Sequence, residues 1–343
     1  MVALAPQAYE QFALHGLLVG SASDWDAAGV PRNSLEALVA AGKLTKVRRG
    51  AYATRAILDL AAGEPGLAYA IKAAAVRAAG KHDNSVVSHE SAALMHGLDL
   101  LGDPPGTSPG LQVSLVVPPG TRTGRHKAAD VSVHVAGVPA KHREDLFFGV
   151  PVTTAARTAV DIARTSPFMQ GVVAADSALR ARVATTRAID RVLTDCRRWP
   201  GMQQARKVAA FATNLSESVL ESCARVVFYE HGLPPPVLQL SIRGGTGTVL
   251  ARADFSWPEY GTIADAEGMA KFDGAEGKKA MAKHLKRDSL LQELGWENVH
   301  FTWADLFGEP DRVVGRLRAS FARGRQLGRE AELLPGSESK RAW

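Results

Sequence analysis

Four acidic residues between positions 221 and 267 have the types and spacing of a site for a hard metal ion. Asp265 and Glu267 stand two positions apart in an expected strand, so their side chains project to the same face. Ten residues separate Asp254 from Asp265, enough for one strand to turn and return as its neighbour. Glu221, on an expected helix before these strands, can add a fourth carboxylate. Clustered carboxylates repel one another unless a cation lies among them.

The cation that suits such oxygen ligands is Mg²⁺, which keeps bound waters that can attack a phosphodiester. We predict that Asp254, Asp265 and Glu267 bind the metal, with Glu221 assisting. Lys271 is expected to offset the charge of the phosphate. These five residues are the candidate catalytic group.

A solvated acidic strand face is the alternative for the same residues. The apolar stretch 262–264 and the following Gly268 favour a buried strand that ends at a site. Lys283 or Arg287, from the next expected helix, are further candidates for contact with phosphate.

A second group of candidates is basic and lies in the first 55 residues, where Lys43 to Arg55 contains five cations and no acid. A charged surface without function is the alternative. The expected phosphate contacts, which give a salt-dependent affinity for double-stranded DNA, are Lys43, Lys46, Arg48 and Arg49. The expected base readers are Arg32, Asn33 and Ser34.

The elements that must position these basic residues form a recognisable series. Ser23 is expected to cap a helix over 24–28, and a Gly-Val-Pro turn leads to a second helix over 32–41. Two short strands around an Arg-Arg-Gly turn follow within 43–54. This order predicts a winged helix-turn-helix.

The remaining sequence predicts an α/β protein of several domains. Mixed helix and strand are expected to about residue 165, then helices, and then the order α-β-β-β-α-β from residue 214 to 303. The predicted domains are the winged helix (1–58), a middle α/β domain (59–165), a helical connector (166–213), an endonuclease-like domain (214–325) and a flexible tail (326–343).

Composition limits the class of protein. Of the 343 residues 46% are hydrophobic and 22% charged, which excludes global disorder. The net charge is +6, and the two cysteines provide no disulfide framework, so we expect a reducing, cytoplasmic location. No 18-residue apolar run and no signal-peptide pattern occur, so neither a membrane span nor secretion is expected.

Other polar residues are assigned structural roles. His89 and His96 are expected to lie in the core or at a helix cap, and Arg157 is expected to pair with Asp161 four residues on. Ser88 and His89 are not expected to face each other. The basic stretch 180–207 either follows DNA or is a solvated surface, and both readings stay open.

The C-terminal region resembles the endonuclease-like domain of the very-short-patch-repair type, within the PD-(D/E)XK nuclease superfamily. This resemblance covers about 90 residues and implies the metal-dependent DNA cleavage described above. The family usually has Glu-x-Asp-Gly where this chain has Asp265-Ala266-Glu267-Gly268. The segments that carry the resemblance are SVLES (218–222), GLP (232–234), RADFSWPE (252–259), DAEGMAKF (265–272), KRDSLL (286–291), LGW (294–296) and FTW (301–303).

The N-terminal half resembles AbiEi-type antitoxin proteins over about 150 residues. The resemblance implies DNA binding and autoregulation of an operon that encodes a toxin partner. It rests on VPRNSL (30–35), GKL (42–44), VRRGAY (47–52), SHESAALMHGL (88–98) and VTTAARTAVDIA (152–163). Two functions therefore follow from the sequence: a DNA-binding regulator or antitoxin, or a Mg²⁺-dependent DNA endonuclease. The oligomeric state is not predicted.

Overall fold

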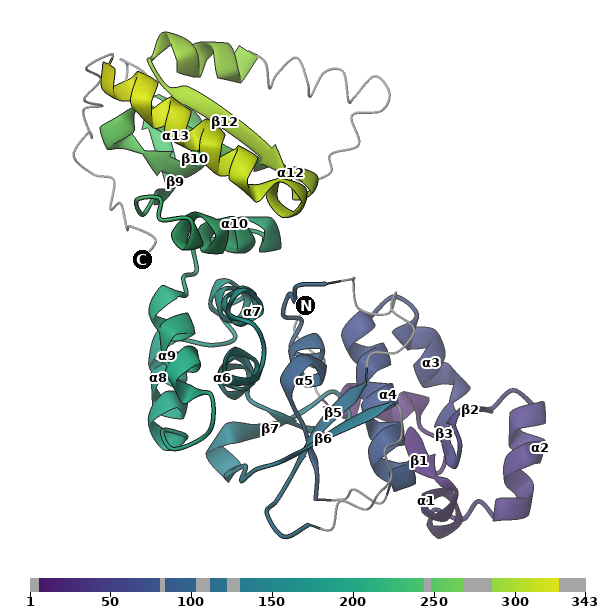
Figure 1. The fold of residues 1–343 in the computed structure, drawn as a ribbon. Coiled ribbons are helices and arrows are strands. Elements are labelled where there is room, and N and C mark those ends of the chain that lie inside the picture. Colours follow the sequence, from purple (N-terminus) through teal and green to yellow (C-terminus); the bar gives the residue numbers. More distant parts are fainter. Residues whose placement is uncertain are drawn as a thin grey trace. The chain divides into compact units, whose positions relative to one another are not determined.

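The structure is a computed structural model that describes residues 6–80, 84–102, 112–121, 130–243, 248–267 and 286–326. The chain forms two compact units, unit 1 (residues 1–209) and unit 2 (residues 210–343). Helices and three separate sheets make this an α/β multidomain protein, as the sequence predicts (Figure 1).

The first part of unit 1 has the element order and sheet of a winged helix-turn-helix. Its strands pair in the order β1-β3-β2, with both pairs antiparallel. Trp25, Val30, Leu35 and Leu44 form a small core within this motif. Its elements are η1 (Pro6–Phe12), β1 (Val19–Ser21), α1 (Ala22–Ala27), η2 (Arg32–Ser34), α2 (Leu35–Ala40), β2 (Leu44–Arg48) and β3 (Ala51–Thr54).

Both helices of this motif differ in their bounds from the sequence prediction. Ser21 rather than Ser23 caps α1, because Ser21 forms a reciprocal capping box with Asp24. The second helix is divided, since the N–H of Ser34 bonds to the carbonyl of Pro31 and closes a 3₁₀ turn ahead of α2. The three expected base readers therefore lie in this turn.

A five-stranded sheet forms the middle of unit 1, in the order β6-β5-β4-β8-β7. Strand β5 is parallel to β6 and β4 is parallel to β8, whereas the other pairs are antiparallel. Its strands are β4 (Val86–Val87), β5 (Val113–Val117), β6 (Val131–Val135), β7 (Arg143–Leu146) and β8 (Val150–Thr153), with η3 (Ala140–His142) before β7.

Helices make up most of the rest of unit 1, and the last of them extends just beyond its end at residue 209. One hydrophobic core includes Leu18 and Ala53 of the winged helix together with Leu67 and Leu115 of the middle region, so these two parts are continuous. The helices are α3 (Arg55–Ala61), α4 (Pro65–Gly80), α5 (His89–Met95), α6 (Ala155–Thr165), α7 (Phe168–Arg180), α8 (Thr186–Asp195) and α9 (Met202–Phe211).

Unit 2 contains a four-stranded sheet in the order β12-β11-β10-β9, in which only β11 and β12 are parallel. Helix α13 crosses one face of this sheet (Figure 1). The elements are α10 (Val219–Glu230), β9 (Val237–Arg243), β10 (Val249–Trp257), η4 (Pro258–Tyr260), β11 (Thr262–Glu267), a helix over 286–293, β12 (Glu297–Thr302), α12 (Trp303–Gly308) and α13 (Pro310–Gln326).

The expected order α-β-β-β-α-β is present in unit 2, but the sequence prediction missed the two helices that follow β12. Thr302 ends the strand and caps α12 through a capping box with Asp305. Phe228 of α10 packs edge-on against Phe255 and Phe301, which joins this helix to the strands of the sheet.

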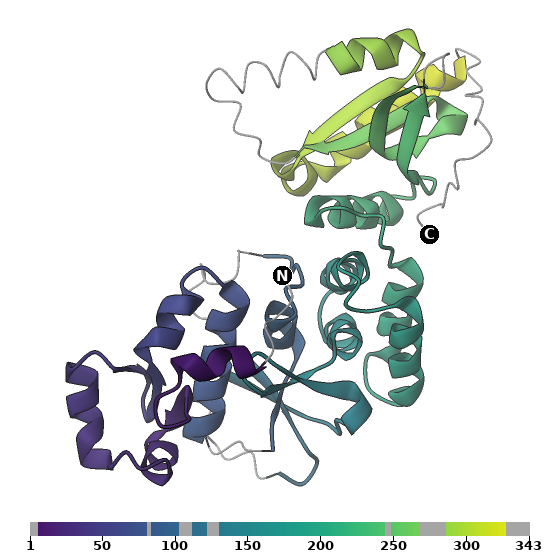
Figure 2. The ribbon, with the colours of Figure 1, turned by 180° about the vertical axis from the view of Figure 1, so that it is seen from behind.

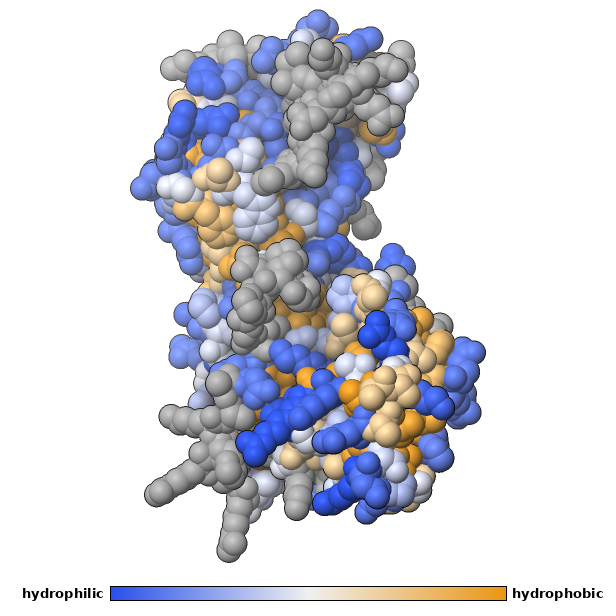
Figure 3. Space-filling model, turned by 90° about the vertical axis from the view of Figure 1, so that its right-hand side faces the viewer, coloured by the Kyte–Doolittle hydropathy of each residue, from blue (hydrophilic) through white to orange (hydrophobic). Residues whose placement is uncertain are grey.

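Within the described residues, no helix combines the length and apolar character needed to cross a bilayer. Hydrophilic residues, with apolar residues between them, cover the face of the molecule drawn in Figure 3.

Candidate functional site

A row of polar residues crosses the sheet of unit 2, one residue on each strand. The register places Gln239 of β9 beside Asp254 of β10, and Asp254 beside Asp265 of β11. Asp265 pairs in turn with His300 of β12. The sequence prediction contained the two aspartates but missed Gln239 and His300. The sequence did contain a signal for Gln239, because this residue is polar and interrupts the apolar stretch 237–242.

Gln239 links the helix to the sheet. Its Nε2 donates to Glu221 Oε2 at 3.0 Å and to Asp254 Oδ1 at 3.4 Å. Glu221 also accepts the backbone N–H of Glu217 at 2.7 Å and the hydroxyl of Ser218 at 2.8 Å. The strand carries Gln239 with a φ of 54°, a left-handed conformation uncommon for a residue with a side chain. Gln239 thus bridges Glu221 and Asp254, two of the predicted site residues.

Burial and mutual repulsion alter the acidity of these two carboxyl groups. Burial, and then the nearby charge of Asp254, raise the pKa of Glu221 to about 7. Burial is also the largest cause of the raised pKa of Asp254, which the charge of Asp265 raises further. The N–H of Ala266 acts in the opposite direction, because it donates to Asp254 Oδ2 at 3.0 Å. Glu221 therefore takes up a proton near neutral pH.

The other two predicted ligands contact cationic or ring partners. Asp265 Oδ2 accepts from Arg287 Nη2 at 2.7 Å, and its Oδ1 accepts the N–H of Asp254 at 3.2 Å. Glu267 Oε1 lies 2.9 Å from His300 Nδ1, and the other ring nitrogen of His300 lies 3.0 Å from Asp288. Glu267 consequently belongs to a different set of contacts from Glu221.

The predicted magnesium site concerns the same four carboxylates. Mg²⁺ needs several oxygen ligands around one point. No three His, Cys, Asp or Glu side chains in the described part of the chain are grouped so that they could hold a metal ion. Each of the four carboxylates already contacts a group of the protein itself. The magnesium site therefore stays a prediction, and Lys271 and Lys283 lie outside the described residues.

The winged helix presents most of its predicted DNA-binding residues to solvent. Ser34 and Arg48 are the partly buried members. The hairpin turn at Gly50, with a φ of 82°, separates the two strands of the wing. The exposed members of the predicted set are Arg32, Asn33, Lys43, Lys46 and Arg49.

Arg48 differs from the other cations of the wing. Its Nη1 lies 3.3 Å from Asp130 Oδ2, and its side chain is 25% exposed. The strand register shifts between Lys46 and Arg48, and this bulge changes the direction of the strand locally. The alternation of a regular strand could not reveal this shift, so the sequence prediction grouped Arg48 with the exposed cations.

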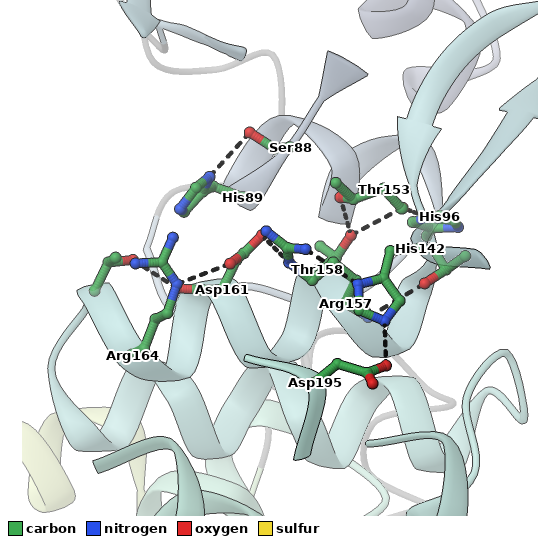
Figure 4. Close-up of polar contacts among 12 residues, drawn as sticks. Ser88, His89, His96, His142, Thr153, Arg157, Thr158, Asp161, Arg164 and Asp195 are labelled. Carbon is green, nitrogen blue, oxygen red and sulfur yellow. Dashed lines mark hydrogen bonds and ion pairs between the residues drawn. The ribbon is translucent and has the colours of Figure 1, made fainter. Parts of the chain in front are cut away.

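A buried ionic cluster lies on α6 (Figure 4). Asp161 accepts from Arg157 Nε and from Arg164 Nε, both at 2.8 Å, and the ring of Trp199 stacks on both guanidinium groups. Arg157 also donates through Nη1 to His142 Nδ1 at 3.2 Å. The predicted pair of Arg157 and Asp161 is confirmed as a contact, and it is part of a larger network.

Ser88 and His89 do face each other, so the opposite expectation was wrong. Ser88 Oγ lies 2.9 Å from His89 Nδ1. The φ of 51° at His89 and the extended backbone of Ser88 bring the adjacent side chains together. Both residues are fully buried, and the His89 ring stacks on His134 at 3.8 Å. A substrate has no access to this pair, which is consistent with the structural role expected for His89.

Comparisons with known proteins leave the family open. No family model matches the chain. Uncharacterized proteins MT2308 and Rv2248, from two strains of Mycobacterium tuberculosis, are each 34% identical over 176 residues. The match covers 51% of this chain and 64% of the length of these curated relatives. The crystal structure of the RV2827C protein from the same species has a TM-score of 0.36 and 17% identity, covering 70% of this chain and 87% of that one.

Proposed function

We propose that this protein is a cytoplasmic DNA-binding transcriptional regulator that docks on duplex DNA through its winged helix. The supporting observation is the exposure of Lys43, Lys46 and Arg49 on the wing, together with Arg32 and Asn33 ahead of α2. Cations on a hairpin beside a short helix fit a phosphate backbone next to a groove.

In this proposal the wing supplies affinity and the turn before α2 supplies sequence preference. Contacts with phosphate are independent of sequence and weaken with salt, whereas polar side chains in the groove read base edges. The polar row of unit 2 then has no chemical step to perform. An AbiEi-like antitoxin role with a toxin partner is the specific form that the resemblance adds to this proposal.

Binding to a duplex from the protein's own promoter tests the proposal. The double variant Lys46→Gln/Arg49→Gln should bind less tightly, and the slope of log affinity against log salt should fall by about two. Arg198→Gln is the matched control, because this exposed cation lies after α8, at the other end of unit 1 from the wing (Figures 1 and 2). Unchanged affinity of the double variant would contradict the proposal, and a loss in Arg198→Gln alone would favour the α8–α9 surface.

A Mg²⁺-dependent endonuclease is the second candidate, and one observation favours it. Glu221, Asp254 and Asp265 come from three different elements and meet across Gln239 and the sheet. Supercoiled DNA incubated with the protein and Mg²⁺ or Mn²⁺ tests this candidate. Cleavage by the wild type that disappears in Asp254→Asn would support a nuclease. DNA that stays intact with both the wild type and the variant would favour the regulator.

A further inference from the structure

A cavity of about 290 Å³ lies between strand β2 of the wing and helices α3 and α4. Branched side chains from Val47, Leu58, Ile71 and Val76 form part of its wall, and alanines of the two helices form much of the rest. The short alanine side chains leave the space open. Its volume is near the lower end of the roughly 300 to 1,000 Å³ typical of pockets for small molecules.

The bulge in β2 explains how this wall is built. Lys46 pairs with Tyr52, but Arg48 pairs with Ala51, so one extra residue stands between the two pairs. In a regular strand Val47 and Arg48 would point to opposite faces. The bulge allows both neighbours to line the same cavity.

Within the described residues, Arg48 places a guanidinium group with an unpaired N–H donor beside this apolar cavity. Its Nε is buried and makes no hydrogen bond within the described part of the chain. Its Nη1 is 3.3 Å from Asp130, at a separation typical of an ion pair without a well-aligned hydrogen bond. A buried donor without an acceptor is costly. An anionic oxygen in the cavity would satisfy this donor.

The guanidinium of Arg48 also favours one kind of anion. Two cations, Arg48 and Lys72, and one anion, Asp130, line the cavity. A guanidinium such as that of Arg48 forms strong charge-assisted hydrogen bonds with a carboxylate. The remaining apolar wall requires a hydrocarbon body on the same molecule.

We propose that this cavity binds a small apolar carboxylate that regulates the wing. The hydrocarbon body fills the alanine-lined space, and the carboxylate accepts hydrogen bonds from Arg48. The regulatory part rests on the proposed DNA binding. A bound anion lowers the positive potential of the strand that carries Lys46 and lies next to Arg49, so it weakens the attraction for phosphate.

Binding of the ligand is tested on the full-length protein without DNA. Benzoate, hexanoate and indoleacetate are titrated by calorimetry, with benzyl alcohol as the uncharged comparison. We expect at least one carboxylate to bind. The affinity of benzyl alcohol should be lower than that of this carboxylate by a factor of about ten or more. Arg48→Gln should weaken carboxylate binding by a similar factor, and Ala68→Leu should abolish it by filling the cavity at an exposed helix position.

Arg49→Gln is the matched control, since it removes the neighbouring exposed cation that does not line the cavity. It should keep wild-type carboxylate affinity. Absence of binding by all three carboxylates, or equal binding by wild type, Arg48→Gln and Ala68→Leu, overturns the proposed site.

Regulation is tested separately by measuring DNA affinity with and without the carboxylate that binds. Several-fold weaker DNA binding in wild type, and no change in Ala68→Leu, supports the regulatory role. Carboxylate binding without any effect on DNA affinity overturns it. Failure of the unliganded protein to bind DNA contradicts the proposed function, while the calorimetric result for the cavity stands by itself.

Discussion

Gln239 donates to Glu221 at 3.0 Å, so an amide on β9 stabilises a carboxylate on α10 that burial makes difficult to ionise. The amide oxygen of Gln239 is buried and has no hydrogen-bond partner within the described residues. This contact joins the helix to the sheet at one end of the polar row. Its strength therefore depends on the protonation of Glu221.

The raised pKa of Glu221 predicts that its contribution to the stability of unit 2 falls with rising pH. Its pKa is about 7 in the folded protein and 4.5 as the reference value, so the folded state binds more protons between these values. This contribution to the free energy of unfolding is fully present below pH 4.5. It is lost as the pH rises through 7, and the total loss is about 3 kcal/mol. Glu221→Gln should remove this dependence, measured by thermal unfolding from about pH 5 to 8. An equal slope in both proteins would contradict the assignment.

His89 predicts the opposite dependence for unit 1. Burial is the main cause that lowers its pKa to about 3 from 6.5, so the folded state binds fewer protons between these values. Stability is lost as the pH falls below 6.5, by about 2 kcal/mol at a pH of about 5. His89→Asn should lose less stability on acidification, and asparagine tolerates the positive φ. Urea unfolding at neutral and acidic pH tests this prediction, which fails if both proteins lose the same free energy.

Removal of the charge of Asp161 should be strongly destabilising. Asp161→Asn leaves the buried Arg157 without its anion, and the free energy of unfolding should fall by about 3 to 5 kcal/mol. Asp59→Asn is the control, because the pair of Arg55 and Asp59 is exposed and contributes less than about 1 kcal/mol. Urea unfolding followed by circular dichroism compares the two variants. Similar losses in both would mean that the α6 network is not a buried ionic cluster.

The two adjacent arginines of the wing should differ in their effects on DNA affinity. Arg49 is exposed, whereas Arg48 faces Asp130 and the cavity. Arg49→Gln should therefore weaken DNA binding several-fold and reduce the salt slope by about one, and Arg48→Gln should change the slope much less. Fluorescence anisotropy over a range of salt concentrations measures both quantities. A larger change of slope for Arg48→Gln would reverse the assignment.

Some features of the candidate site were visible in the sequence because they depend on local spacing. The spacing of Asp254 and Asp265 predicted neighbouring strands, and the structure pairs them. Gln239 was missed because its role depends on the register with β10, which is a contact between distant segments. The magnesium prediction remains a prediction, since Lys271 lies outside the described residues and the described carboxylates contact protein groups instead.

The sequence by itself determined the α/β class, the winged-helix order of elements and the α-β-β-β-α-β order of unit 2, because hydrophobic period and turn residues act over a few positions. Only the tertiary structure decided that Arg48 pairs with Asp130 and is not one of the exposed cations, that Ser88 contacts His89, and that Glu267 contacts His300 rather than Glu221. A bulge, a positive φ and a strand register decide these contacts, and each depends on packing between segments that periodicity does not describe.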